Sequence, residues 1–161
     1  ILTNGNADAS TLSLPLGAVR MRETFVRCDP IAPQEFEEMR DHIERTVAKR
    51  IAPTSGRWTQ AVGVGGGVRF LHTMYGVFRA THMQDQPLRT DQLEHLTQTI
   101  WPLKVDTLVR NFGIDRERAE IIVPGAVVLL ALMKRLGLGS IRPSWRGVRD
   151  GMLAEFIDSL S

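Results

Sequence analysis

The sequence is poor in cysteine, in excess charge of either sign and in long apolar runs. Cys28 is the single cysteine in 161 residues, so no internal disulfide can form, as is usual in a reducing compartment such as the cytoplasm. The formal net charge of +2 implies no broad basic surface, which argues against nucleic acid as a partner. Apolar runs stop well short of the roughly 20 residues that span a bilayer, so we expect no membrane segment.

Side chains that usually build metal or nucleophilic centres are also sparse. The four histidines, His42, His72, His82 and His95, show no spacing typical of metal ligands. Ser144 has no nucleophile-elbow motif around it, and Cys28 has no sequence neighbour that would activate a thiol. We therefore identify no catalytic residue and no metal ligand in this chain.

What the sequence does contain is a glycine-rich stretch. Gly63, Gly65, Gly66 and Gly67 fall between a short apolar run and an apolar-periodic segment. This order predicts a strand over Trp58–Val62, a loop, and a helix over Val68–Phe78. Glycine lets the backbone approach a ligand, and the first amides of a helix have no intrahelical partner. The stretch is a candidate anion site, and the alternative is a turn that only permits tight packing.

The residues before this stretch predict a hairpin and two helices. Ile1–Thr3 reads as the end of a strand, followed by an Asn-Gly turn and a second strand over Ser10–Leu16. Ala18–Val26 is predicted to be a short helix. A longer helix is expected from Gln34 to Ile51, because Phe36, Met39, Ile43 and Val47 form one apolar stripe.

The residues after it predict mostly helices. Asp91 is a candidate N-cap of a helix ended by Pro102, and a further helix ends at Gly113. Asp115 is expected to cap the next helix. Pro124 is expected in the first turn of a separate, buried helix that continues to Leu136.

The end of the chain is predicted to add one more strand and one more helix. A short strand is predicted around Ile141, and an amphipathic helix is predicted to begin at Ser144 or Trp145 and to run to Leu160. The order of elements predicts an α/β fold with a mixed sheet flanked by helices. Within it, the strand at Trp58–Val62 should lie parallel to the strand at Ile141.

Three separated stretches together resemble the exopolyphosphatase and guanosine pentaphosphate phosphatase family (Ppx/GppA). They are Ser13–Arg20 with Glu23 and Phe25; Val62–Leu71; and Glu117–Ile122 with Gly125, Ala126, Ser144, Gly147, Arg149 and Gly151. Their order and spacing agree along nearly the whole chain. The resemblance implies an RNase H-like domain of the actin, sugar-kinase and heat-shock superfamily, with residues 1–161 as the second domain of a Ppx/GppA-type phosphatase.

The resemblance also implies a chemistry for the intact protein. It would be a cytoplasmic, Mg²⁺-dependent phosphohydrolase that removes terminal phosphate from polyphosphate or from pentaphosphorylated guanosine (pppGpp). The first domain, with the catalytic glutamate and an Asp-x-Gly-Gly-Gly-Ser loop, is expected before Ile1, where the chain starts without methionine. That domain is thus an expected partner, a homodimer is left open, and the fragment alone is expected to be inactive.

Six residues are candidates for binding phosphate: Gly63, Gly65, Gly66, Gly67, Arg69 and Arg118. Arg69 directly follows the glycines and could approach an anion or point to solvent. Arg118 matches a family arginine that can reach the cleft, and the alternative is an exposed arginine paired with Glu117 or Glu120.

The glycine loop departs from the Gly-Thr-Gly-Gly-Thr pattern usual in the family. Val64 and Gly67 stand in place of the threonines, and Phe70 in place of a small polar residue. Two other functions therefore remain open. One is a nucleotide- or phosphate-sensing domain without turnover, and the other is a sugar-kinase-like ATP-binding domain.

Overall fold

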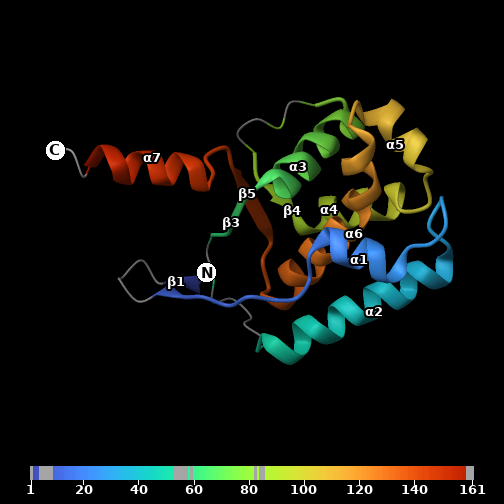
Figure 1. The fold of residues 1–161 in the computed structure, drawn as a ribbon, viewed down its shortest axis with the longest axis horizontal. Helices are drawn as coiled ribbons and strands as arrows, with labels where there is room; N and C mark the ends of the chain where they lie inside the picture. The colour runs from blue at the N-terminus through green and yellow to red at the C-terminus, as the bar shows by residue number, and fades with distance from the viewer. Residues whose placement is uncertain are drawn as a thin grey trace.

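The protein consists of a helical body with a small mixed sheet at one side (Figure 1). The computed structural model describes residues 2–3, 9–52, 58, 60–81, 83 and 86–158. In chain order the elements are β1 (Leu2–Thr3), β2 (Ala9–Ser10), α1 (Ala18–Phe25), α2 (Pro33–Arg50), β3 (Val62–Val64), α3 (Gly66–Arg79), β4 (Leu88–Arg89), α4 (Thr90–Ile100), α5 (Val105–Phe112), α6 (Arg116–Arg135), β5 (Ser140–Ser144) and α7 (Val148–Asp158). The predicted α/β architecture is confirmed.

Helix α6 is the centre of the body and packs against α1, α2, α3, α4 and α5. The prediction that Pro124 opens a separate helix is wrong, because Pro124 lies inside this one continuous helix. Proline has no amide to donate to the carbonyl of Glu120, which is a local cost. Burial of Ile122, Val123 and Ala126 around it favours the unbroken helix, so tertiary packing overrides the local preference.

The amphipathic prediction for α2 is confirmed. Phe36, Met39, Ile43 and Val47 are each at most 3 % exposed. They follow the three-and-four spacing that places side chains on one face of a helix. The short helix predicted over Ala18–Val26 is also present, as α1.

The main sheet has the strand order β3-β5-β4, with β3 parallel and β4 antiparallel to β5. The parallel pairing of the two predicted strands is confirmed, but the predicted range Trp58–Val62 is wrong. Pairing with β5 begins at Val62, which lies opposite Arg142, and ends at Val64 opposite Ser144. Pairing with β5 therefore sets the position of β3, and the strand leads directly into the glycine loop.

The N-terminal hairpin is shorter than predicted. Leu2 pairs with Ser10 and Thr3 with Ala9, and the chain beyond Ser10 is not in a strand. After Ser10, the alternation that continues to Leu16 has no ladder partner among the described residues, so the periodicity alone does not make a strand there.

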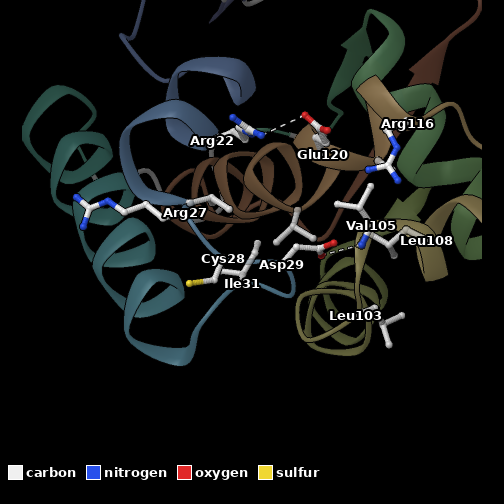
Figure 2. Close-up of a pocket in the computed structure, with 13 residues that line it drawn as sticks. Arg22, Arg27, Cys28, Asp29, Ile31, Leu103, Val105, Leu108, Arg116 and Glu120 are labelled. Atoms are coloured by element: carbon white, nitrogen blue, oxygen red, sulfur yellow. Dashed lines mark hydrogen bonds and ion pairs between the residues drawn. The ribbon is translucent and has the colours of Figure 1, made fainter.

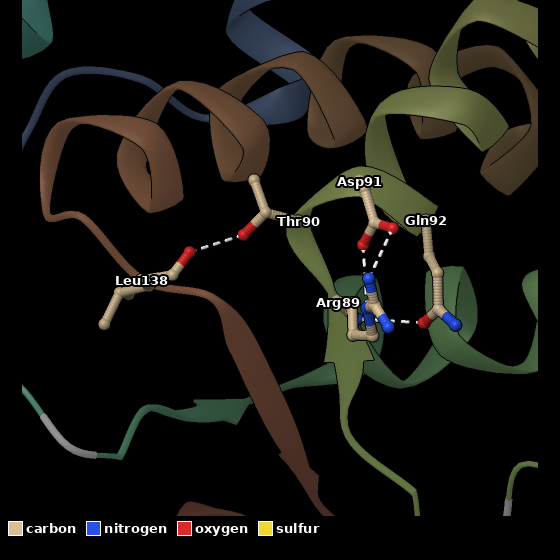
Figure 3. Close-up of polar contacts among 5 residues, drawn as sticks. All are labelled: Arg89, Thr90, Asp91, Gln92 and Leu138. Carbon is tan, nitrogen blue, oxygen red and sulfur yellow. Dashed lines mark hydrogen bonds and ion pairs between the residues drawn. The ribbon is translucent and has the colours of Figure 1, made fainter.

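Strand β4 was not predicted, and the start of α4 differs from the prediction. Figure 3 shows the Thr90 hydroxyl donating to the Leu138 carbonyl, which ties this corner to β5. Helix α4 begins at Thr90, so Asp91 is not its N-cap. Instead, Asp91 accepts two hydrogen bonds from the Arg89 guanidinium, at 2.9 and 2.8 Å, which hold the pKa of the carboxyl below its usual value.

The end of α5 and the start of α6 agree with prediction, but the start of α7 does not. Gly113 ends α5 with φ 63°, and the Asp115 carboxylate caps α6 by accepting from the Arg118 amide at 2.8 Å. Helix α7 begins at Val148 and not at Ser144 or Trp145, because Ser144 still pairs with Val64 in the sheet. Within the described ranges, no helix is long and apolar enough to cross a membrane.

Candidate functional site

The glycine loop joins β3 to the first turn of α3 and leaves the helix amides open. Gly65 has φ 111° and ψ 168°, a conformation that L side chains rarely adopt. Gly66 and Gly67 are exposed, and a Cβ atom on either would meet nothing within 4 Å. No side chain caps α3, and its first turn holds no acidic residue. The amides ahead of Arg69 therefore have no intrahelical partner and lie at the positive end of the helix dipole.

Gly63 has a different environment from the other three glycines. It is buried, and a Cβ atom there would lie 2.5 Å from Cγ1 of Val68 and 3.0 Å from Cδ1 of Ile141. The missing side chain lets the start of α3 lie close against the sheet. Gly63 thus serves packing, which is the alternative that the sequence left open for the whole loop.

Arg118 contacts α3 at Phe70, one turn after the glycine loop. Its guanidinium carbon is 4.5 Å from the centroid of the Phe70 ring, a cation–π contact between α6 and α3. Phe70 follows Gly66 by four residues, and helical side chains point back toward the N-terminus. The carboxylate near Arg118 is Asp115, at 3.8 Å, and not Glu117 or Glu120. The Arg118 side chain is 44 % exposed, and its guanidinium has donors left for an anion.

Arg69 is engaged in the framework of the site. Its guanidinium donates to the carbonyl of Trp145 at 3.3 Å, although the two residues are far apart in sequence. This contact ties α3 to the segment that joins β5 to α7. The structure therefore links Arg118 to α3 through Phe70, four residues after Gly66, while Gly63 and Arg69 shape the loop.

Phe70 is the residue of the site whose role the sequence did not indicate. In the sequence it stands out only as a departure from the family pattern. Its spacing from Gly66 places it one turn into α3, but the partner on α6 is set by tertiary packing. No local pattern relates Phe70 to Arg118.

A hollow of about 150 Å³ lies elsewhere, between α1, the segment after it, α5 and α6 (Figure 2). Most of its charged groups already have a polar partner. Arg22 contacts Glu120 at 3.3 Å, the Asp29 carboxylate accepts from the Val105 amide at 2.9 Å, and Arg116 pairs with Asp106. This pairing leaves the hollow a weaker anion site than the glycine loop.

Cys28 lies at the rim of that hollow and is exposed. The negative charge of Glu35 is the main cause that raises the pKa of the thiol, with smaller contributions from desolvation and a hydrogen bond to the same carboxylate. A raised pKa keeps the thiol protonated at neutral pH.

The described part of the chain gathers no group of three or more histidine, cysteine, aspartate or glutamate side chains that could hold a metal ion. The residues at the glycine loop supply amides and a guanidinium, which are ligands for anions and not for cations. The Mg²⁺ implied by the family resemblance therefore does not fit the described residues of this site.

The chain is similar to proteins of a known family over nearly its whole length. Residues 1–160 match the Ppx/GppA phosphatase family. Exopolyphosphatase 1 of Mycobacterium leprae is 26% identical over 152 residues, which are 92% of this chain and 45% of that protein.

Solved structures agree in fold. The Aquifex aeolicus member of the Ppx/GppA family superposes with a TM-score of 0.81 at 22% identity, over 95% of this chain and 50% of that one. An exopolyphosphatase from Cytophaga hutchinsonii gives a TM-score of 0.70 at 17% identity, over 89% and 48%. The chain thus spans about half the length of these relatives. The fold is the RNase H-like fold predicted, and the chain belongs to the Ppx/GppA phosphatase family.

Proposed function

We propose that this chain forms one wall of the phosphate cleft of a phosphohydrolase that removes terminal phosphate from polyphosphate or pppGpp. The observation that carries the proposal is the open set of amides at Gly66 and Gly67, with the Arg118 guanidinium held over Phe70 one turn further along α3. Backbone amides at a helix start and a planar guanidinium are complementary to phosphate oxygens. Family membership supports the phosphohydrolase class, and the cytoplasm is the proposed compartment.

In this proposal the chain binds and orients phosphate and does not activate water. The oxygen of a water molecule bonds to the terminal phosphorus while the anhydride P–O bond breaks and its electron pair leaves with the shortened chain. The loop amides and Arg118 would stabilise negative charge on the phosphate oxygens. The base for water and the ligands of Mg²⁺ would belong to the first domain, which is why the fragment alone should be inactive.

The test measures orthophosphate release by the full natural protein, with polyphosphate, pppGpp and ATP as substrates. We expect release from polyphosphate or pppGpp, and none from either by the 161-residue chain. Arg118→Ala should lower kcat/KM about 10- to 100-fold, since a hydrogen bond to a charged group contributes roughly 1.5–3 kcal/mol. Arg110→Ala, an exposed arginine on α5, is the matched control and should leave the rate unchanged.

The outcomes separate the three functions. Release by the 161-residue chain, or equal rates for Arg118→Ala and wild type, would contradict the roles proposed above. Transfer of phosphate from ATP to a sugar or acid would assign a sugar-kinase-like function instead.

A second candidate function is phosphate or nucleotide sensing without turnover. Val64 favours this function, because its exposed side chain has no hydroxyl to donate to a phosphate beside the loop. Binding of polyphosphate or pppGpp by the full protein without hydrolysis would decide for it. Val64→Thr with Gly67→Thr should then tighten phosphate binding, if the replaced hydroxyls are what weakened the site.

A further inference from the structure

The Phe70 ring of α3 and the Arg118 guanidinium of α6 form a contact between two helices. The guanidinium carbon lies 4.5 Å from the ring centroid, within the roughly 6 Å over which cation–π attraction acts. Phe70 is half-buried and packs against the core, whereas the Arg118 side chain is 44 % exposed. The ring is therefore the anchored partner, and the arginine, which has more rotatable bonds, is the partner that it holds.

The charge of Arg118 is only weakly neutralised by carboxylates. One oxygen of Asp115 lies 3.8 Å from Nε of Arg118, while the other accepts the Arg118 amide at 2.8 Å as the cap of α6. Both side chains are exposed, so this ion pair contributes little. Glu120, two residues further along α6, pairs with Arg22 of α1 at 3.3 Å instead. The guanidinium thus keeps most of its charge for an anion.

The kind of partner decides what the guanidinium can still bind. A carboxylate that held Arg118 closely would occupy its N–H donors and cancel its charge, so that a phosphate would have to displace it. An aromatic ring holds a cation through its negative π face and carries no net charge. Among the hydrogen bonds of the described residues, none comes from this guanidinium. Its donors are therefore available to phosphate oxygens.

We propose that Phe70 is a positioning residue, which holds Arg118 for a phosphate chain without neutralising it. Ordering a long, exposed side chain on binding costs affinity, and a side chain that is ordered beforehand avoids part of that cost. The small polar residue common at this position in the family pattern has no aromatic face, so that pattern does not supply this means of holding the arginine. The inference deepens the proposed function and rests on its assignment of phosphate to Arg118.

The experiment is a calorimetric titration of the full natural protein with inorganic tripolyphosphate, without added Mg²⁺ so that turnover does not obscure binding. Phe70→Leu keeps an apolar side chain but removes the π face, and it should weaken the affinity about two- to fivefold, the strength of a cation–π contact at an exposed site. Phe70→Tyr keeps the π face and should lose less than about twofold.

Two further variants test whether Phe70 acts through Arg118. Phe78→Leu is the matched control, because Phe78 is a half-buried phenylalanine of the same helix whose ring contacts Tyr75 and His95. It should leave the affinity unchanged. In an Arg118→Ala background, Phe70→Leu should change the affinity by less than about 1.5-fold, since the group that the ring positions is gone.

Equal affinities of Phe70→Leu and the wild type would overturn the inference. An equal loss from Phe70→Leu with and without Arg118 would also overturn it, because the ring would then act on the ligand or on the helix directly. Weaker binding by Phe70→Leu alone, in a full protein that hydrolyses neither polyphosphate nor pppGpp, would support the inference while contradicting the proposed function. Hydrolysis that depends on Arg118 but not on Phe70 would do the reverse, so the two proposals can fail separately.

Discussion

At the residue scale, the glycines of one short stretch serve three different purposes. Gly63 allows close packing, Gly65 adopts a positive φ, and Gly66 and Gly67 leave backbone amides open. The sequence predicted the loop and its position. It could not distinguish the roles, because the atoms that surround Gly63 come from α3 and from the distant strand β5.

This difference predicts opposite effects of the same substitution. Gly63→Ala should lower the free energy of unfolding by about 1–3 kcal/mol, because the added methyl group overlaps Val68 and Ile141. Gly67→Ala should be neutral or stabilising by up to about 1 kcal/mol, since alanine is favoured over glycine in a helix. Urea denaturation of both variants is the measurement. Equal losses of stability would mean that steric overlap at Gly63 is not the cause.

At the element scale, the start of α2 is fixed by a carboxylate that binds the chain before it. The Glu35 carboxylate accepts hydrogen bonds from the amides of Arg27 at 3.1 Å, Cys28 at 3.3 Å and Ala32 at 3.1 Å. Partial desolvation raises the pKa of Glu35, but these donors outweigh it and hold the pKa below its ordinary value. The ionised carboxylate therefore stabilises the junction of α1 and α2.

The expected consequence is a pH-dependent loss of stability in Glu35→Ala. A carboxyl group whose pKa is lowered on folding stabilises the protein above its unfolded pKa, about 4.3, and loses that effect as the pH falls through the folded value. We expect a loss of about 1 kcal/mol at pH 7, similar to loss of a helix cap, that shrinks below about pH 4. Glu44→Ala, an exposed position on α2, should change stability by less than about 0.5 kcal/mol. A loss for Glu35→Ala that is constant with pH would contradict this role.

Elements with strong local signals were predictable from the sequence. The stripe of α2, the Asp115 cap of α6 and the Gly113 end of α5 each depend on residues within one or two turns. Strand β4 and the unbroken α6 were not predictable. A two-residue strand shows no period, and its position depends on β5. Pro124 is a local signal for a helix start that burial of its neighbours overrides.

At the scale of the whole molecule, the body around α6 and the side with β3 and α7 differ in how completely their apolar residues are buried. The core around α6 is closed, with Met39, Ile43, Leu96, Ile100 and Met133 fully buried. The side with β3 and α7 exposes valines and large apolar residues next to the candidate phosphate site. The sequence predicted an amphipathic helix in this region but not that its large apolar residues would remain exposed, because hydrophobic periodicity does not tell which layer covers a helix.

The pairing of β3 with β5 also has a consequence for biosynthesis. The strand that leads into the glycine loop has its described ladder partner near the C-terminal end of the chain. The ribosome must therefore release almost all of the helical body before this pairing can form, and non-local pairing is intrinsically slow. We expect the loop to acquire its native geometry last. Pulse-labelled hydrogen exchange during refolding should show protection of α2 and α6 before that of Val62–Val64, and the reverse order would contradict this sequence of events.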